Sequence, residues 1–166
     1  MSFCYINGSY KNNIDASISV EDRGFNFSDG VYEVIGFRKK KLLNLERHMK
    51  RLSKSLIDLQ IRIPFSNQNS LKIIIHHLLK LNDVDDGFLY LQITRGTAKR
   101  NHLFPCKVEP NIVIFTFSKE GLDKIKKGVN IGLTKDQRWM RCDIKSISLL
   151  ANVLDKQRGF EKGFFE

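Results

Sequence analysis

A run of apolar residues near position 50 changes the periodicity of the chain and most constrains its fold. Its members fall four, three, four and three residues apart: Leu45, Met49, Leu52, Leu56 and Leu59. That spacing puts them on one face of an amphipathic helix ending before Pro64. A second helix is expected next, capped by Ser66 or Asn67. Its apolar face would consist of Leu71, Ile74, Ile75 and Leu78.

Segments on both sides of these helices alternate apolar and polar residues, a pattern that predicts half-buried strands. Asn7-Gly8 interrupts the first of them and predicts a tight hairpin turn. A second hairpin is expected with the basic run 38–41 at its tip, and two more strands at 88–96 and 111–118. Strands and helices in this order predict an α+β domain of two layers, with the helices against an antiparallel sheet.

The chain is expected to divide into two unequal parts. Residues 1–119 would form the N-terminal α+β domain, the polar segment 120–127 a linker, and residues 128–166 the start of a second domain. In this second part, residues 129–134 predict a strand and residues 148–163 a helix. One strand and one helix are too few for a core, so this domain is expected to be incomplete. Its apolar helix side chains would lack cover: Leu149, Leu150, Val153 and Leu154.

Composition narrows the class of protein. Hydrophobic residues make up 42% of the chain, enough for a sizeable core. No apolar run approaches the ~18 residues that cross a bilayer, and the N-terminus lacks a secretory signal pattern. Three scattered cysteines, which form neither a disulfide framework nor a metal pair, favour a reducing compartment. We therefore expect a cytoplasmic protein without a membrane partner.

The distribution of charge and the positions of the histidines argue against a nucleic-acid partner and against a metal site. The formal net charge of +10 arises largely from scattered lysines, and the chain has no nucleic-acid-binding motif. We therefore expect no nucleic-acid partner, although a basic nucleic-acid module stays an alternative. His48, His76 and His77 have no Cys, Asp or Glu at ligand spacing, so no metal site is expected. His48 is expected to be structural, and Trp139 to lie in the core.

Four collinear stretches carry a resemblance to a known family. They are VEDRGFNFSDGVYEVIGF, ERHMKRLSKSL, YLQITRGTAKRNHLFP and RWMRCDIKSISLLANVLDKQ, which together span most of the chain. In order and spacing they resemble the class IV aminotransferases, the fold-type IV group of pyridoxal-phosphate enzymes, and most closely its D-amino acid branch. The resemblance implies a second domain shaped as a pseudo-barrel and pyridoxal 5′-phosphate as cofactor. It also implies a homodimer that converts D-alanine and 2-oxoglutarate to pyruvate and D-glutamate.

The resemblance also implies roles for individual residues. Lys145 would hold the cofactor as a Schiff base, which requires a primary amine, and then act as general base and acid at the substrate α-carbon. Arg51 would bind the cofactor phosphate, because a guanidinium donates two parallel hydrogen bonds and stays charged. Arg100 and His102 would receive the substrate carboxylate in the neighbouring subunit's site, with Tyr32 as a third group of that pocket.

Ordinary structural roles stay open for the same residues. Lys145 and Arg51 could be exposed basic side chains, Arg100 and His102 could belong to a solvated loop, and Tyr32 could pack within a sheet.

The resemblance also has a limit at the end of the sequence. In the family, the acid at the pyridine nitrogen and the rest of the phosphate cup lie beyond the position of Glu166. Impaired transamination by this chain alone is therefore expected. The chain could be a gene remnant without catalysis, a fragment, or one half of an enzyme completed by a separate polypeptide. Within the family, branched-chain aminotransferase and aminodeoxychorismate lyase activities stay alternatives.

Overall fold

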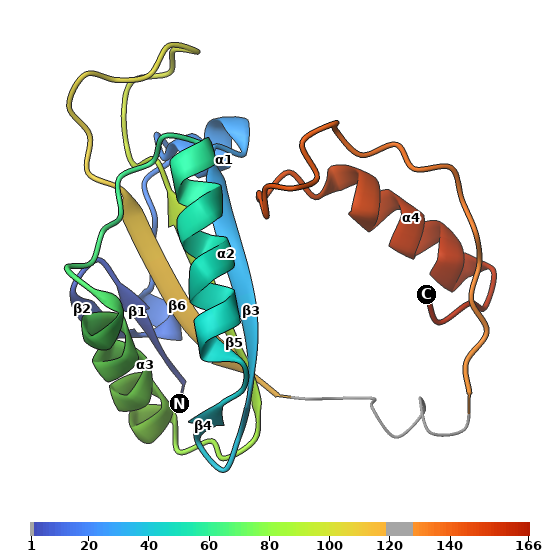
Figure 1. Cartoon of the computed structure of the whole chain (residues 1–166), viewed down its shortest axis with the longest axis horizontal. Coiled ribbons are helices and arrows are strands. Elements are labelled where there is room, and N and C mark those ends of the chain that lie inside the picture. Colours follow the sequence, from blue (N-terminus) through green and yellow to red (C-terminus); the bar gives the residue numbers. More distant parts are fainter. Residues whose placement is uncertain (1, 119–127) are drawn as a thin grey trace.

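The computed structural model of the protein describes residues 2–118 and 128–166 (Figure 1). Its elements in chain order are β1 Phe3–Ile6, β2 Ser9–Asn12, the short 3-10 turn η1 Asn13–Asp15, α1 Arg23–Phe27, β3 Gly30–Arg38, β4 Lys41–Leu42, α2 Leu45–Asp58, α3 Gln68–Asn82, β5 Gly87–Thr94, β6 Asn111–Phe117 and α4 Leu150–Glu161. The expected linker, residues 120–127, lies outside the described residues.

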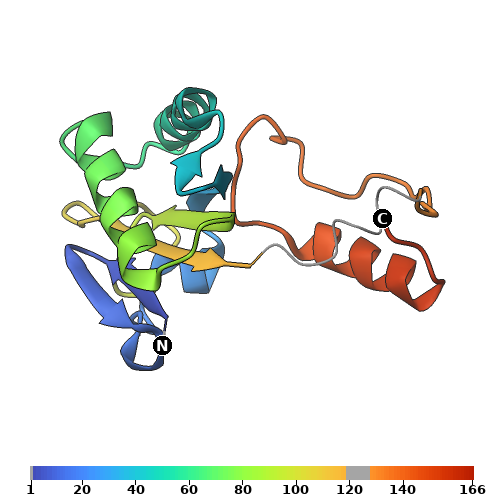
Figure 2. The ribbon, with the colours of Figure 1, turned by 90° about the horizontal axis from the view of Figure 1, so that it is seen from below.

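The first part of the chain is built on one antiparallel sheet. Its strand order is β2-β1-β6-β5-β3-β4, so β5 and β6 lie in the middle. Helix α2 packs on β3, and α3 packs on β1 and β6, both on the same face of the sheet (Figure 2). The prediction of a two-layer α+β domain is therefore confirmed. Its most buried side chains come from both layers: Val31, Ile35, Leu56, Leu71, Ile75, Leu78, Leu89, Leu91, Ile93 and Ile114.

Both expected hairpins are present, and the backbone conformation at each tip involves residues with positive φ values. Asn7 and Gly8 have φ values of 46° and 96° between β1 and β2, the left-handed conformations that a tight turn of this kind requires. The basic tip joins β3 to β4, and there Lys39 and Lys40 also adopt positive φ.

The two expected helices, α2 and α3, are confirmed. On α2 the apolar stripe is buried, with Leu52 1% and Leu56 0% exposed. At the start of α3, the Asn67 side chain accepts a hydrogen bond from the Ser70 backbone N–H at 2.9 Å, so Asn67 is the cap. No helix in the described ranges is long and apolar enough to span a membrane.

Helix α1 was not predicted. It has only five residues, too few to show a helical period. The Asp22 side chain accepts hydrogen bonds from the backbone N–H groups of Gly24 and Phe25, at 2.8 and 3.2 Å. An aspartate cap was therefore the only sequence signal for this helix.

The second part of the chain is less regular. Helix α4 confirms the prediction for residues 148–163, but the strand predicted at 129–134 is wrong, because no strand forms there. Two backbone hydrogen bonds of 2.8 Å join this segment to the chain end, from Gly132 to Glu166 and from Phe165 to Asn130. Two bonds to an irregular segment do not make a strand ladder.

The apolar side chains of α4 are uncovered, as expected. Leu150 is 72%, Val153 60% and Leu154 47% exposed. In Figure 1 the helix stands apart from the sheet.

Candidate functional site

The segment that carries Lys145 docks along the free edge of β3. The Tyr32 N–H donates to the Lys145 carbonyl at 3.0 Å, and the Ile147 N–H donates to the Gly30 carbonyl at 3.1 Å. Just before them in the chain, Ile144 is inserted into the core and is only 4% exposed. The two parts of the chain therefore meet at this edge, and the meeting fixes the backbone on both sides of the lysine.

Gly30 permits this close approach. A Cβ at this position would lie 2.7 Å from the Ile93 carbonyl oxygen and 3.1 Å from the Ile147 side chain. The first distance is shorter than van der Waals contact allows, and the atom it meets is backbone, which cannot easily move. A larger residue would therefore clash with β5, and it would also crowd the Ile147 side chain of the docked segment.

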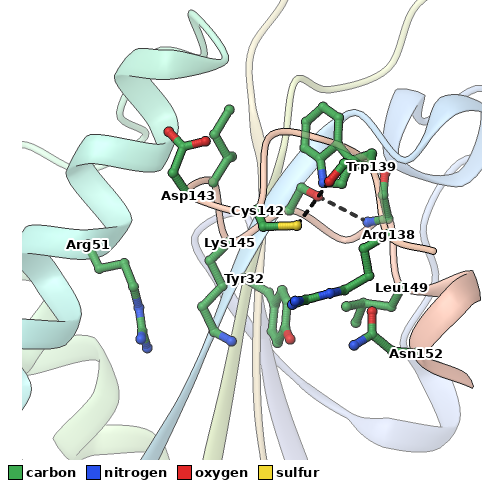
Figure 3. A pocket seen from close by; sticks show the side chains of 12 residues that line it. Tyr32, Arg51, Arg138, Trp139, Cys142, Asp143, Lys145, Leu149 and Asn152 are labelled. Carbon is green, nitrogen blue, oxygen red and sulfur yellow. Dashed lines mark hydrogen bonds between the residues drawn. The ribbon is translucent and has the colours of Figure 1, made fainter. Parts of the chain in front are cut away.

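The Lys145 amine lies over an aromatic ring. Its Nζ is 4.1 Å from the centre of the Tyr32 ring, a distance at which the ring attracts a cation. Tyr32 itself stacks on Tyr90 with centroids 5.6 Å apart. Tyr32 therefore packs in the sheet and also lies against the lysine (Figure 3). Its role in a carboxylate pocket stays a prediction.

Lys145 and Arg51 line the same cavity, whose volume is about 320 Å³. Small-molecule sites in proteins begin at about this size, roughly 300 Å³. Figure 3 shows Arg51 on α2, Lys145 on the docked segment and Tyr32 on β3 around this space. The remaining lining residues are Arg138, Trp139, Cys142, Asp143, Ile144, Ser146, Ser148, Leu149 and Asn152.

Arg51 is fixed by a buried carboxylate. Its Nε and Nη2 donate to Glu33 at 2.7 and 2.6 Å, a bidentate pair. His48 Nδ1 lies 2.7 Å from the same carboxylate, whose side chain is 0% exposed, whereas Arg51 is 48% exposed. Hydrogen bonding to Glu33 raises the pKa of Arg51 above its ordinary value, so the guanidinium stays charged. Within the described part of the chain, Nη1 has no hydrogen-bond partner and can serve a ligand.

Glu33 was missed by the sequence reasoning, although a signal was present. In the alternating strand it shares a face with Val31 and Ile35, which are fully buried. A carboxylate on the core face of a strand must be paired. The pattern could therefore have predicted a basic partner from the helix that covers this face.

Ion pairs surround the approach to Lys145. Arg138 binds Asp136 and lowers the pKa of that carboxyl to about 2, mainly through its side-chain hydrogen bonds. Hydrogen bonds from Arg141, and then from Lys54, lower the pKa of Asp143 well below its ordinary value. These carboxylates are engaged by basic side chains, and across residues 2–118 and 128–166 no three potential metal ligands gather.

The expectation that Trp139 lies in the core is wrong. Its side chain is 42% exposed and lines the cavity. The Cys142 thiol donates to the Trp139 carbonyl at 2.9 Å, which closes a turn there. The core in this region is occupied by Ile144 instead.

Arg100 and His102 come together, but away from this cavity. The Phe27 ring lies 5.1 Å from the Arg100 guanidinium and 5.2 Å from the His102 ring. The buried Arg23 holds their loop by donating to the carbonyl of Asn101 at 2.6 Å. Both side chains thus lie against the same ring, although the loop bends at Arg100 and His102 and is not extended there. Within this single chain they do not reach Lys145.

Comparisons with known proteins agree on one family. A family model described as amino-transferase class IV matches residues 30–166. A D-alanine aminotransferase of Staphylococcus haemolyticus is 38% identical over 159 residues, covering 95% of this chain and 56% of that protein. Another from Bacillus licheniformis is 40% identical, covering 96% and 56%. The chain thus spans little more than half the length of these relatives.

Solved structures share the fold at lower identity. The branched-chain amino acid aminotransferase of Escherichia coli superposes with a TM-score of 0.87 at 16% identity, covering 98% of this chain and 57% of that one. The 4-amino-4-deoxychorismate lyase of Pseudomonas aeruginosa gives 0.79 at 22% identity, covering 98% and 59%. Both support the architecture described above.

Proposed function

Because this chain belongs to the class IV aminotransferases, a family whose cofactor is pyridoxal 5′-phosphate, we propose that it binds this cofactor and that its assembled enzyme transaminates D-amino acids. The observation that carries the proposal is the shared cavity of Lys145 and Arg51. A primary amine and a guanidinium in one small space are the groups that an aldehyde bearing a phosphate requires.

The residues present fit the cofactor in part. Arg51 is charged and has Nη1 available for a phosphate oxygen, while Glu33 fixes its direction. Ser146 and Ser148 add hydroxyl groups to the cavity wall, and Asn152 adds an amide. When bound, the cofactor supplies an aldehyde and an electron-withdrawing ring.

The chemistry assigned to the chain itself centres on Lys145. Its Nζ would hold the cofactor through the aldehyde carbon, with water as the leaving group, and when free it would move a proton to and from the substrate α-carbon. The Tyr32 ring below it limits where this nitrogen can move. Tyr32 also offers a hydroxyl that can donate to a substrate carboxylate.

The proposed preference for D-amino acids rests on the names of the relatives and on the loop that carries Arg100 and His102. The curated relatives named above, at about 40% identity, are D-alanine aminotransferases. Arg100 and His102 lie side by side on Phe27 and can together bind a carboxylate. Neither side chain lines the cavity of Lys145 within one chain, which supports a homodimer in which this loop serves the neighbouring site. The branched-chain and lyase structures share only the fold at their low identity.

Catalysis requires more polypeptide than this chain provides. The chain spans 56% of its relatives' length, and the apolar residues of α4 are exposed. Residues 128–166 are in this proposal the start of a cofactor-binding domain that further chain, continuous or separate, completes. The isolated chain should therefore transaminate weakly or not at all. We place the protein in the cytoplasm.

Covalent trapping tests the central claim. The purified chain is mixed with pyridoxal 5′-phosphate, reduced with borohydride and digested, and the modified lysine is located by mass spectrometry. Labelling should be concentrated on Lys145, because its amine lies against the cavity that Arg51 lines. The exposed Lys50, also on α2, serves as the internal control for random modification.

Two variants separate the possible outcomes. Lys145→Ala should remove the specific label, and Arg51→Ala should weaken labelling without removing the amine. Equal labelling of Lys50 and Lys145 would refute cofactor binding. Assays with D-alanine, L-leucine and aminodeoxychorismate then distinguish the three activities, and robust turnover by the isolated chain would refute the need for further polypeptide.

A further inference from the structure

A serine occupies the apolar face of α2 where a larger hydrophobic side chain would fit the pattern. Ser55 lies between Leu52 and Leu56 and is 0% exposed. Its Oγ accepts the backbone N–H of Lys145 at 3.1 Å, although 90 residues separate the two in sequence. A hydroxyl buried on this face therefore bonds the peptide group of the lysine.

The position of Ser55 on the helix links it to Arg51. The two residues are four apart, so they lie one helical turn from each other on neighbouring parts of the surface. One rigid element thus carries the guanidinium that lines the cavity and the hydroxyl that contacts the lysine backbone. Helix α2 sets the spacing between these two groups.

Lys145 is held from two directions. The Ser55 hydroxyl binds its N–H, and the Tyr32 N–H of β3 binds its carbonyl at 3.0 Å. The neighbouring residues are held as well, by burial of Ile144 and by the hydrogen bond from Ile147 to Gly30. The Ser55 hydroxyl is the contact made to the lysine N–H itself.

We propose that Ser55 is a positioning residue for Lys145. By accepting the lysine N–H, it fixes the peptide plane from which the side chain extends over Tyr32 into the cavity. Ser55 lines no part of that cavity and acts only through Lys145. The inference rests on the proposed function for the importance of the amine, but the structural link itself does not.

Amide hydrogen exchange in the cofactor-free chain tests the link. In Ser55→Ala the Lys145 amide loses its acceptor, and we expect its exchange to become about tenfold faster, the usual scale for losing one hydrogen bond. Amides of Leu89 and Leu91 in the core should be unchanged. Ser53→Ala, on the same helix but without this contact, is the matched control. Unchanged exchange at Lys145 in Ser55→Ala would overturn the proposal.

A second measurement addresses positioning rather than packing. With pyridoxal 5′-phosphate and borohydride, Ser55→Ala should label Lys145 severalfold more slowly than the parent chain, and the circular dichroism of the bound cofactor should weaken. Ser55→Thr keeps an acceptor oxygen and should restore both signals. Equal loss in the threonine variant would assign the effect to packing and overturn the proposal. If the parent chain shows no label on Lys145, the proposed function fails, while the exchange experiment still decides the role of Ser55.

Discussion

Helices α2 and α4 have similar lengths and both carry an apolar face, but only the apolar face of α2 is buried. On α2, Met49, Leu52, Ser55 and Leu56 are buried against the sheet, whereas α4 has no buried residue. The first helix follows a strand hairpin that offers a complete sheet face. The second lies beside an irregular segment held by a few backbone hydrogen bonds.

The difference shows that an apolar helix face must be covered by another surface, and that the sequence of the helix does not provide this surface. Burial stabilises a helix only when a complementary surface exists in the same molecule. In residues 2–118 that surface is the sheet, whose central strands are fully buried on the helix side. In residues 128–166 the sole firm attachment is the short run around Ile144, where the site is built.

The largest expected effect on the free energy of unfolding is in residues 2–118, where helices cover the sheet. Leu89 is 0% exposed in the central strand β5, so Leu89→Ala should lower the free energy of unfolding by about 3 kcal/mol through lost burial and a residual cavity. Denaturant unfolding followed by circular dichroism measures this change. A loss below about 1 kcal/mol would mean that the sheet core relaxes freely, contrary to the close packing described.

An intermediate effect is expected from Tyr90, on the face of the sheet without helices. Burial, and then the nearby Tyr32, raise the pKa of Tyr90 from 10.0 to about 12. A raised folded-state pKa means that the unfolded chain loses this proton first. The stability it contributes is therefore complete below pH 10 and disappears as pH rises to about 12.

Unfolding curves between these pH values, compared with Tyr90→Phe, test the assignment. The variant lacks the ionisable hydroxyl and should lose less stability over the same interval. Phenolate absorbance in the folded parent chain should show a tyrosine that titrates at about pH 12 and is missing in Tyr90→Phe. If the two chains give the same titration curve at high pH, that face of the sheet is more open than described.

The smallest effect should come from α4. Leu150 is 72% exposed, so Leu150→Ala should change the free energy of unfolding by less than about 0.5 kcal/mol, as is usual for exposed sites. The same denaturant titration used for Leu89 gives a direct comparison. A loss comparable to that of Leu89→Ala would show that this helix is covered in solution, for example by a second copy of the chain.

Much of the covered region could be predicted from sequence because its signals are local. The Asn7-Gly8 turn, the stripe of α2 and the cap at Asn67 each follow from a few neighbouring residues. The strand predicted at 129–134 failed because an alternating pattern needs a partner strand, and no local signal reports whether one is there. Trp139 was misplaced for a related reason, since size and hydrophobicity alone do not determine which side chain reaches the core.

For the site, the sequence by itself singled out Lys145, Arg51, Tyr32, Arg100 and His102 through resemblance, and it determined the α+β class. Only the tertiary structure decided which of these residues share a cavity. It placed Lys145, Arg51 and Tyr32 together, left the pair on the loop elsewhere, and added Glu33 and Ser55. The physical reason is range: periodicity and turns act over a few residues, whereas hydrogen bonds such as that between Ser55 and Lys145 join positions 90 residues apart.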